Sequence, residues 1–282
     1  MGFEAGWFVE TLHPGVAQRF AVSQIIHHGR TAWQEVAIFD NPAFGRMVAL
    51  DDAIQVAERD EFIYHEMLTH VPMLAHGAVR RVLIIGGGDG GILRRCLMHA
   101  GLESAVLVEI DGEFVELMRR HLPAISAGAF EDPRGTLVIS DGADYMRSAR
   151  GFDLIIVDST DPLGPGAVLF SEAFYRDCRA ALAPGGVLVT QAGVPFLQGD
   201  ELRLVRSRLG SVFADAAAFQ AAVPSYYGGA MAFGWASDDP ALRTRPVEEI
   251  AARFQDSRLE TRYYTPAIHA AAFALPRYFA AS

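Results

Sequence analysis

The sequence predicts an α/β fold in which a parallel sheet covered by helices follows a smaller domain built of β-strands. From residue 81 onward, short runs rich in Val, Ile and Leu alternate with helical segments. Such continuous apolar runs are typical of strands buried on both faces of a parallel sheet. Before that point the chain has shorter runs separated by turn residues. We therefore predict a β-strand domain with a linking helix over residues 1–76 and an α/β domain over residues 77–282.

The N-terminal elements follow from alternation and turn chemistry. Residues 33–39 alternate between apolar and polar, and Asp40-Asn41-Pro42 marks a turn. Two further strands, 46–50 and 53–56, flank a hairpin turn at Asp51-Asp52. The spacing of apolar residues then predicts a helix over 61–74.

The later elements alternate regularly. The apolar runs predict strands at 82–85, 105–108, 136–139, 154–157 and 187–190, with two late strands at 219–222 and 230–236. Helices are predicted at 90–100, 111–121, 142–149, 171–182, 198–213 and 247–254. This alternation is that of a Rossmann-like domain.

Composition narrows the functional class. The net charge of −10 argues against nucleic acid as a partner and is compatible with a cationic small-molecule substrate. No run of about 20 apolar residues and no signal-peptide pattern is found, which predicts a cytoplasmic protein without a membrane partner. The two cysteines, Cys96 and Cys178, lie in apolar helical contexts and are interpreted as buried free thiols. His65 and His70 are five positions apart rather than four, so we predict no metal site there.

A glycine-rich turn follows the first strand of the α/β domain. It has the spacing Gly86-x-Gly88-x-x-Gly91, and Glu109 lies 18 residues farther on, where a ribose-binding acid is expected. This pattern alone suits either NAD or an S-adenosyl compound. Asp89 favours the second, because its carboxylate would repel a pyrophosphate and attract a sulfonium compound that carries an amine.

Acidic residues follow four successive strands. Asp89, Glu109, Asp141 and Asp158 would all lie at the carboxyl edge of the sheet, where open α/β sheets bind ligands. A helix-capping role is the alternative for Asp89. The last acid begins a loop, 158–165, that is stiffened by two prolines and is typical of a site-lining segment.

Several segments together resemble the spermidine synthases, within the polyamine aminopropyltransferases. The resemblance rests on the helix 58–67, the glycine-rich turn 82–91, the loop 158–165 and the segment 224–229, and it extends over nearly the whole chain. It implies a Rossmann-like, methyltransferase-type sheet domain behind a small β domain. His65 stands where eukaryotic members have Gln but fits bacterial members, and Thr160 replaces a commoner Ser.

The resemblance also implies roles for individual residues. Asp158 would be the general base on the attacking amine, Asp89 would bind the amine of the aminopropyl group, and Glu109 and Asp141 would bind the ribose and the adenine. The residues implied for the donor and its product methylthioadenosine are Gln34, Gly86, Gly88, Glu109, Asp141, Gly142 and Pro165. Those implied for the amines are Tyr64, His65, Asp89, Ser159, Thr160, Asp161, Gln191 and Tyr226, although Tyr64 and Tyr226 could instead be core aromatics.

The activity implied is aminopropyl transfer from decarboxylated S-adenosylmethionine, as co-substrate, to putrescine, giving spermidine and 5'-methylthioadenosine with no metal or prosthetic group. Cadaverine or agmatine remain alternative acceptors. A methyltransferase that uses intact S-adenosylmethionine is disfavoured, since Asp89 would repel the carboxylate of that donor. A catalytically silent polyamine-binding protein is disfavoured because the acids are retained. The resemblance also implies a homodimer.

Overall fold

The structure is a computed structural model that describes residues 2–160, 164–227 and 229–280. Two small antiparallel sheets come first, one ordered β1-β2-β3 and the other β4-β5-β6-β7. Their strands are β1 (Phe3–Glu4), β2 (Trp7–Glu10), β3 (Gln18–Ala21), β4 (Gln24–Arg30), β5 (Glu35–Asn41), β6 (Gly45–Leu50) and β7 (Ala53–Ala57). The three strands predicted here correspond to β5, β6 and β7, whereas β1 to β4 were not predicted.

A seven-stranded sheet forms the rest of the fold, ordered β10-β9-β8-β11-β12-β14-β13. Its strands are β8 (Arg81–Gly86), β9 (Ser104–Glu109), β10 (Gly135–Ile139), β11 (Phe152–Asp158), β12 (Leu182–Gln191), β13 (Asp215–Ala221) and β14 (Met231–Ser237). The first five run parallel, and β14 and β13 complete one side as antiparallel strands. The predicted parallel α/β fold behind a small β domain is thus confirmed.

Seven helices fall close to the predicted positions, whereas α4, α9 and α10 were not predicted. The helices are α1 (Glu61–His76), α2 (Gly91–Leu97), α3 (Gly112–His121), α4 (Pro123–Ser126), α5 (Gly142–Ser148), α6 (Glu172–Ala181), α7 (Gly199–Val212), α8 (Val247–Ser257), α9 (Pro266–Ala272) and α10 (Arg277–Ala280). Short polar side chains fix several starts: Asp111 accepts from the N–H of Phe114 at α3, and Ser171 accepts from that of Phe174 at α6. Helix α1 ends at Gly77, whose φ of 79° suits glycine.

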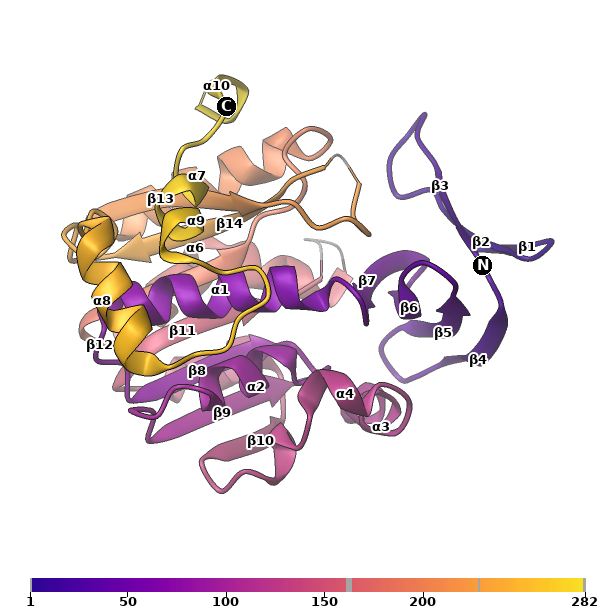
Figure 1. Ribbon diagram of the computed structural model, residues 1–282, viewed down its shortest axis with the longest axis horizontal. Helices are drawn as coiled ribbons and strands as arrows, with labels where there is room; N and C mark the ends of the chain where they lie inside the picture. Colours follow the sequence, from indigo (N-terminus) through magenta and orange to yellow (C-terminus); the bar gives the residue numbers. More distant parts are fainter. Residues whose placement is uncertain (1, 161–163, 228, 281–282) are drawn as a thin grey trace.

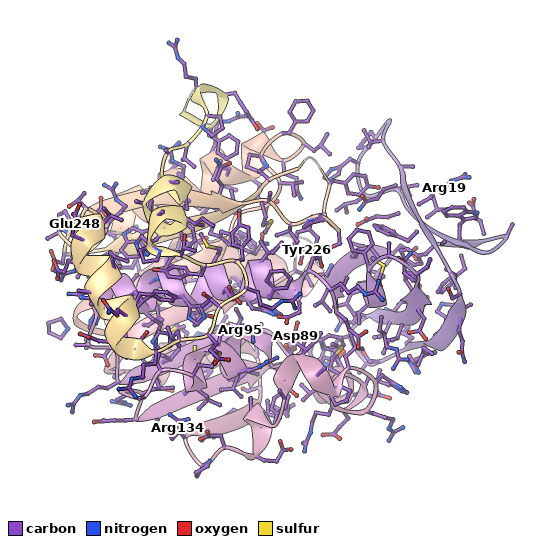
Figure 2. All side chains as sticks on the ribbon, in the orientation of Figure 1. Arg19, Asp89, Arg95, Arg134, Tyr226 and Glu248 are labelled. Carbon is purple, nitrogen blue, oxygen red and sulfur yellow. The ribbon has the colours of Figure 1, made fainter. Side chains whose placement is uncertain are left out.

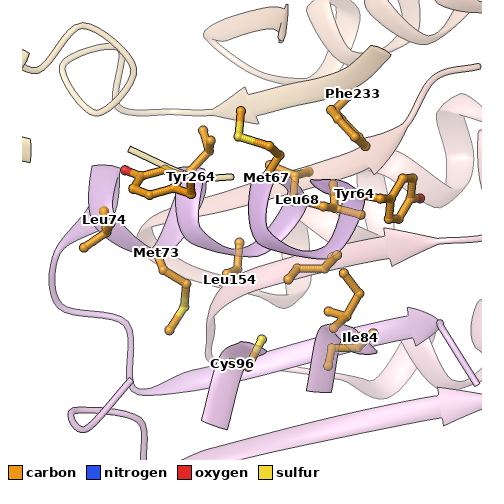
Figure 3. Close-up of a cluster of buried hydrophobic side chains, with 14 of the residues drawn as sticks. Tyr64, Met67, Leu68, Met73, Leu74, Ile84, Cys96, Leu154, Phe233 and Tyr264 are labelled. Carbon is orange, nitrogen blue, oxygen red and sulfur yellow. The ribbon is translucent and has the colours of Figure 1, made fainter. Parts of the chain in front are cut away.

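Helix α1 lies across one face of the seven-stranded sheet, with α8 and α9 beside it (Figure 1). The N-terminal strands β1 to β7 lie together beyond one end of that sheet, and β7 leads into α1. Met67, Leu68 and Val71 are fully buried in this layer, and Figure 3 shows α1 side chains facing Ile84 and Leu154 of the sheet. A helix that is apolar on most sides belongs in a core. The predicted division near residue 76 remains a prediction, and α1 itself packs on the α/β sheet.

The opposite face of the sheet is covered by α5, α6 and α7, whose side chains form a second core with β11 and β12. A third cluster joins the four-stranded sheet to α3, with Val36 and Val48 against Phe114 and Met118. Cys96 and Cys178 are both buried and free, as predicted. In the described part of the chain no helix is long and apolar enough to span a membrane.

Candidate active site

The strand order reverses between β8 and β11, and this is where open α/β sheets form a ligand crevice. Gly86 at the end of β8 pairs with Asp158 at the end of β11. The φ of Gly86 is +80°, and a Cβ there would lie 2.1 Å from the carbonyl oxygen of Asp158. The glycine is therefore needed for the two strand ends to lie this close together.

A cavity of about 380 Å³ opens at this point between the sheet, α1 and the N-terminal strands. Figure 2 labels Asp89 and Tyr226 in the region where these parts meet. The predicted site residues that line it are Gln34, Tyr64, His65, Gly86, Gly88, Asp89, Glu109, Asp141, Gly142, Asp158, Ser159, Thr160, Gln191 and Tyr226. Asp161 lies outside the described residues, and Pro165 belongs to a 3-10 helix, η2 (Gly164–Phe170).

Asp158 is bound directly by a residue of α1. The hydroxyl of Tyr64 donates to Oδ1 of Asp158 at 2.6 Å. Burial, together with the charge of Asp89, raises the pKa of the Asp158 carboxyl to about 6. The carboxylate is therefore mostly ionised at neutral pH and still basic enough to accept a proton.

Charges of alternating sign run from Asp89 into the core. The ring of His65 lies between two carboxylates: Nδ1 is 2.6 Å from Oε2 of Glu61, and Nε2 is 3.4 Å from Oδ2 of Asp89. Arg95 of α2 follows, with Nη2 at 3.0 Å from Oε1 of Glu61. The side chains of His65, Glu61 and Arg95 are almost completely buried, so each charge depends on the neighbouring one.

The protonation of this chain follows from its geometry. Burial alone would favour a neutral His65 ring, but the charges and hydrogen bonds of Asp89 and Glu61 outweigh it and raise the pKa to about 10. Burial would likewise raise the pKa of Glu61, yet its hydrogen bond with His65 and the charge of Arg95 lower it. His65 is thus an imidazolium that faces Asp89.

Asp89 also contacts the start of α2. Its Oδ1 accepts from the backbone N–H of Gly91 at 2.7 Å. The N-cap residue of α2 is Gly90, so this bond is a local turn before the helix and not the side-chain cap raised as the alternative for Asp89; it exists alongside the contact with His65. A Cβ on Gly91 would lie 2.2 Å from Cε1 of His65, so glycine at this position makes room for the ring.

Glu109 lies at the end of β9 and is almost fully buried. Its Oε1 accepts from the N–H of Asp111 at 2.9 Å, and burial raises the pKa of its carboxyl to about 7. Asp111 in turn accepts from Gln34 Nε2 at 2.9 Å and from Thr31 Oγ1 at 2.6 Å. The β domain thereby places Gln34 beside the end of β9.

The remaining predicted residues lie around the same rim. Asp141 caps α5 by accepting from the N–H groups of Ala143 and Asp144, at 2.7 and 3.1 Å. Gln191 at the end of β12 donates to the carbonyl oxygen of Thr160 at 3.3 Å. The hydroxyl of Ser159 is buried without a hydrogen-bond partner among the described residues.

Tyr226 closes the cavity on the side of the N-terminal strands. Its ring centroid lies 6.1 Å from that of Tyr64, and its hydroxyl donates to the backbone carbonyl of Gln55. Both phenols have pKa values raised by burial and by the charge of Asp158. The two rings line the cavity, and Tyr64 also packs against the core residue Phe233.

The sequence reasoning missed four acids that line the cavity, Glu10, Asp51, Asp60 and Glu61, and it missed Asp111, which binds Gln34. Glu61 had a usable signal, because it precedes His65 by four positions in a predicted helix and so lies on the same face. Asp111 also had one, at the start of the next predicted helix. Nothing in the sequence placed Asp60 beside Ser225, 165 residues away, whose N–H it accepts at 2.8 Å. Among the described residues no group of three or more His, Cys, Asp or Glu could hold a metal ion.

Comparison with known proteins identifies the family. A spermine/spermidine synthase domain matches residues 61–246, and a spermidine synthase tetramerisation domain matches residues 6–58. The chain belongs to the spermine/spermidine synthase family. The predicted family and the enzyme class, an aminopropyltransferase, are thereby confirmed, and the methyltransferase alternative is disfavoured.

Individual relatives are similar in sequence or structure to nearly the whole chain. Polyamine aminopropyltransferase 1 of Pseudomonas aeruginosa is 54% identical over 96% of this chain and 95% of the relative. The polyamine aminopropyltransferase of Klebsiella pneumoniae is 54% identical over 95% and 94%. The spermidine synthase of Thermotoga maritima superposes with a TM-score of 0.90 at 37% identity, covering 99% of this chain and 94% of its own. A spermidine synthase in complex with the transition state analogue AdoDATO superposes with a TM-score of 0.92 at the same identity and coverage.

Proposed function

We propose that this protein transfers the aminopropyl group of decarboxylated S-adenosylmethionine to putrescine, giving spermidine and 5'-methylthioadenosine. The observation that carries the proposal is the pairing of Asp158 with Tyr64 in the same cavity as Asp89. One buried carboxylate is available to take a proton, and a second is available to bind a cation. A structural relative at 37% identity is a spermidine synthase in complex with AdoDATO, which is consistent with this donor.

The donor fits the half of the cavity beside the glycine-rich turn. We assign the ribose hydroxyls to Glu109 and the adenine to Asp141 and Gly142, since these residues lie at the ends of adjacent strands. Gln34 would close this half from the β domain. Asp89 would bind the ammonium of the aminopropyl group, because its carboxylate lines the cavity and no lysine or arginine of the described lining competes for it.

The reaction is an in-line displacement. The nitrogen of the acceptor forms a bond to the methylene carbon attached to sulfur, the C–S bond breaks, and its electron pair returns to the sulfonium, which leaves as a neutral thioether. The attacking amine must be neutral, and reaching that form at pH 7 costs about 4–5 kcal/mol for an alkylamine. Asp158 would accept the proton as the C–N bond forms, while Tyr64 holds the carboxylate in position.

The acceptor side is built of aromatic rings and acids. Tyr64 and Tyr226 offer faces to an alkylammonium chain. Gln191 holds the backbone of Thr160 at the border of this half. Asp161, which the sequence also assigns here, lies outside the described residues.

The test is mass spectrometry of the purified enzyme with decarboxylated S-adenosylmethionine and equimolar putrescine, cadaverine, agmatine and spermidine. We expect methylthioadenosine with spermidine as the dominant new amine. Methylthioadenosine with another product would retain aminopropyl transfer and change the acceptor. Absence of methylthioadenosine with every amine would overturn the proposal. The homodimer and the cytoplasmic location remain predictions, and the tetramerisation-domain match supports an oligomer of some kind.

A further inference from the structure

The contacts of the His65 ring fix its ionisation by geometry. A neutral imidazole carries one N–H, so it donates from one ring nitrogen and presents a lone pair at the other. Both ring nitrogens of His65 face carboxylates, with Nδ1 at 2.6 Å from Glu61 and Nε2 at 3.4 Å from Asp89. Two such contacts are favourable together only when both nitrogens carry protons. The ring is therefore an imidazolium as long as both carboxylates are charged.

The charge of Glu61 depends in turn on Arg95. Nη2 of Arg95 donates to both carboxylate oxygens of Glu61, at 3.0 and 3.3 Å. The side chains of both residues are almost completely buried, so removing either charge would leave the other uncompensated. Arg95 is not among the residues that line the cavity, and it acts on the site through Glu61 and His65.

No other charged group is placed to take over from Glu61. Among the described residues, the groups within ion-pair distance of the His65 ring are the carboxylates of Glu61 and Asp89. The other titratable or charged groups around the ring act from farther away: Tyr64, with a ring centroid 5.7 Å from that of His65, Arg94 and Arg95, which act through Glu61, and Asp158. The charge of Glu61 therefore decides whether the buried ring keeps its second proton.

The charge of His65 acts on the proposed base. Burial and the charge of Asp89 raise the pKa of the Asp158 carboxyl to about 6, and the charge of His65 opposes both effects. Two carboxylates that line one cavity favour the protonation of one of them unless a cation lies close by. A protonated Asp158 could not accept a proton from the attacking amine.

We propose that Glu61, paired with Arg95, is a positioning residue that keeps His65 cationic and so keeps Asp158 ionised when the acceptor binds. The inference rests on the proposed aminopropyl transfer with Asp158 as its base. It adds the buried pair that maintains the charge of the site without touching the reacting atoms.

The ionisation of His65 can be measured directly by imidazole ¹⁵N NMR of the whole enzyme, with His65→Gln to identify the signal. In the wild type we expect an imidazolium at about pH 8.5, since the pKa of the ring is raised to about 10. In Glu61→Gln the side-chain amide can donate to Nδ1 while the Nε2–H donates to Asp89, so we expect a neutral ring at the same pH.

Glu61→Gln leaves Arg95 buried without a carboxylate, which could prevent folding. The double variant Glu61→Gln/Arg95→Met removes both charges together, and it should show the same neutral ring. Glu58→Gln is the matched control, because it removes a carboxylate three residues earlier at a side chain that does not line the cavity. It should keep the imidazolium.

The pH dependence of the reaction separates this charge effect from a structural one. The ratio of variant to wild-type kcat/KM for putrescine cancels the ionisation of the acceptor itself. Since a neutral His65 no longer lowers the pKa of Asp158, we expect this ratio to fall roughly tenfold from about pH 8.5 to about pH 5.5 in both Glu61 variants. The ratio for Glu58→Gln should be the same at both pH values.

Three results would overturn the inference alone: a neutral His65 in the wild type, a cationic His65 in the Glu61 variants, or a loss of kcat/KM that is equal at every pH. An imidazolium in a wild type that makes no methylthioadenosine would instead overturn the proposed function, and with it the use of this charge in the transfer.

Discussion

At the scale of single residues, Asp158 carries the most direct prediction. It is buried, receives a hydrogen bond from Tyr64 at 2.6 Å, and has a pKa raised by burial to about 6. Asp158→Asn keeps the shape and removes the basic group, so kcat should fall on the order of 10²- to 10⁴-fold. Calorimetry should still show wild-type binding of methylthioadenosine. Near-normal turnover in this variant would reject Asp158 as the base.

The same pKa sets a pH dependence for the wild type. A carboxyl with a raised pKa is protonated, and so inactive as a base, below about pH 6. The kcat/KM for the acceptor should therefore decline as the pH falls through that value.

Asp89 makes two contacts whose roles can be separated, because it accepts from the N–H of Gly91 at the start of α2 and faces the imidazolium of His65. Asp89→Asn can retain the bond to Gly91 while losing the charge. Its affinity for decarboxylated S-adenosylmethionine should fall by roughly tenfold or more, whereas methylthioadenosine, which lacks the aminopropyl ammonium, should bind almost as before. Calorimetry with both compounds is the measurement, with Asp89→Ala as the variant that loses both roles. Equal losses for the two compounds in Asp89→Asn would make Asp89 structural only.

At the scale of elements, strands and helices with a clear period were predictable. The apolar runs predicted β8 to β12. The acids that follow four of these strands line one cavity, because parallel strands end at the same edge of the sheet. Strands β1 to β3 were missed because they have only two to four residues, and β4 was missed because none of its seven residues is buried and it lacks a regular apolar alternation. The contacts of Arg95 with Glu61 and of Ser225 with Asp60 join residues that are far apart in the chain. They depend on how α1 packs, and no local sequence pattern predicts that packing.

Two histidine contacts outside the site lie where α1 and α9 meet their neighbours. His70 Nδ1 lies 3.0 Å from His99 Nε2, which follows α2, and His269 Nδ1 lies 2.8 Å from the hydroxyl of Tyr264. The rings of His70 and Tyr264 are 5.7 Å apart and join the two pairs. Burial lowers the pKa of His70, and it lowers those of His99 and His269 to about 4. These rings are neutral in the folded protein.

Histidines that are held neutral, two of them buried and His99 half-buried, make the packing of these helices sensitive to acid. The unfolded chain takes up protons near pH 6.5 and the folded chain does not, so their stabilising effect is complete above that pH and is lost as the pH falls toward 4. His99 alone should lower the free energy of unfolding by about 2 kcal/mol when the pH falls from roughly 7.5 to 5. His99→Gln can still hydrogen-bond His70 but does not titrate in this range. Urea unfolding at both pH values should show a smaller loss for this variant, and an identical loss would remove His99 as a cause.

At the scale of the whole molecule, the active site depends on both parts of the chain. The α/β part supplies the carboxylates at the strand ends, and the N-terminal strands supply Gln34 and the backbone carbonyl that holds Tyr226. Core contacts between Val36, Val48 and Phe114 fix the two parts together. A change that loosens the β domain should therefore affect catalysis as well as stability.

The β domain also leaves large apolar side chains on its surface. Trp7 is 44% exposed and Ile25 is 48% exposed, and both lie within residues 6–58, which match a spermidine synthase tetramerisation domain. Because exposed apolar groups of this size favour contact with another chain, we expect Ile25→Glu to lower the mass found by light scattering at a given concentration. Val247→Glu, at an exposed apolar residue of α8 outside the matched domain, is the control and should keep the wild-type mass. The wild-type mass itself tests the predicted homodimer. A monomeric wild type, or an equal effect of both variants, would show that these strands do not form the interface.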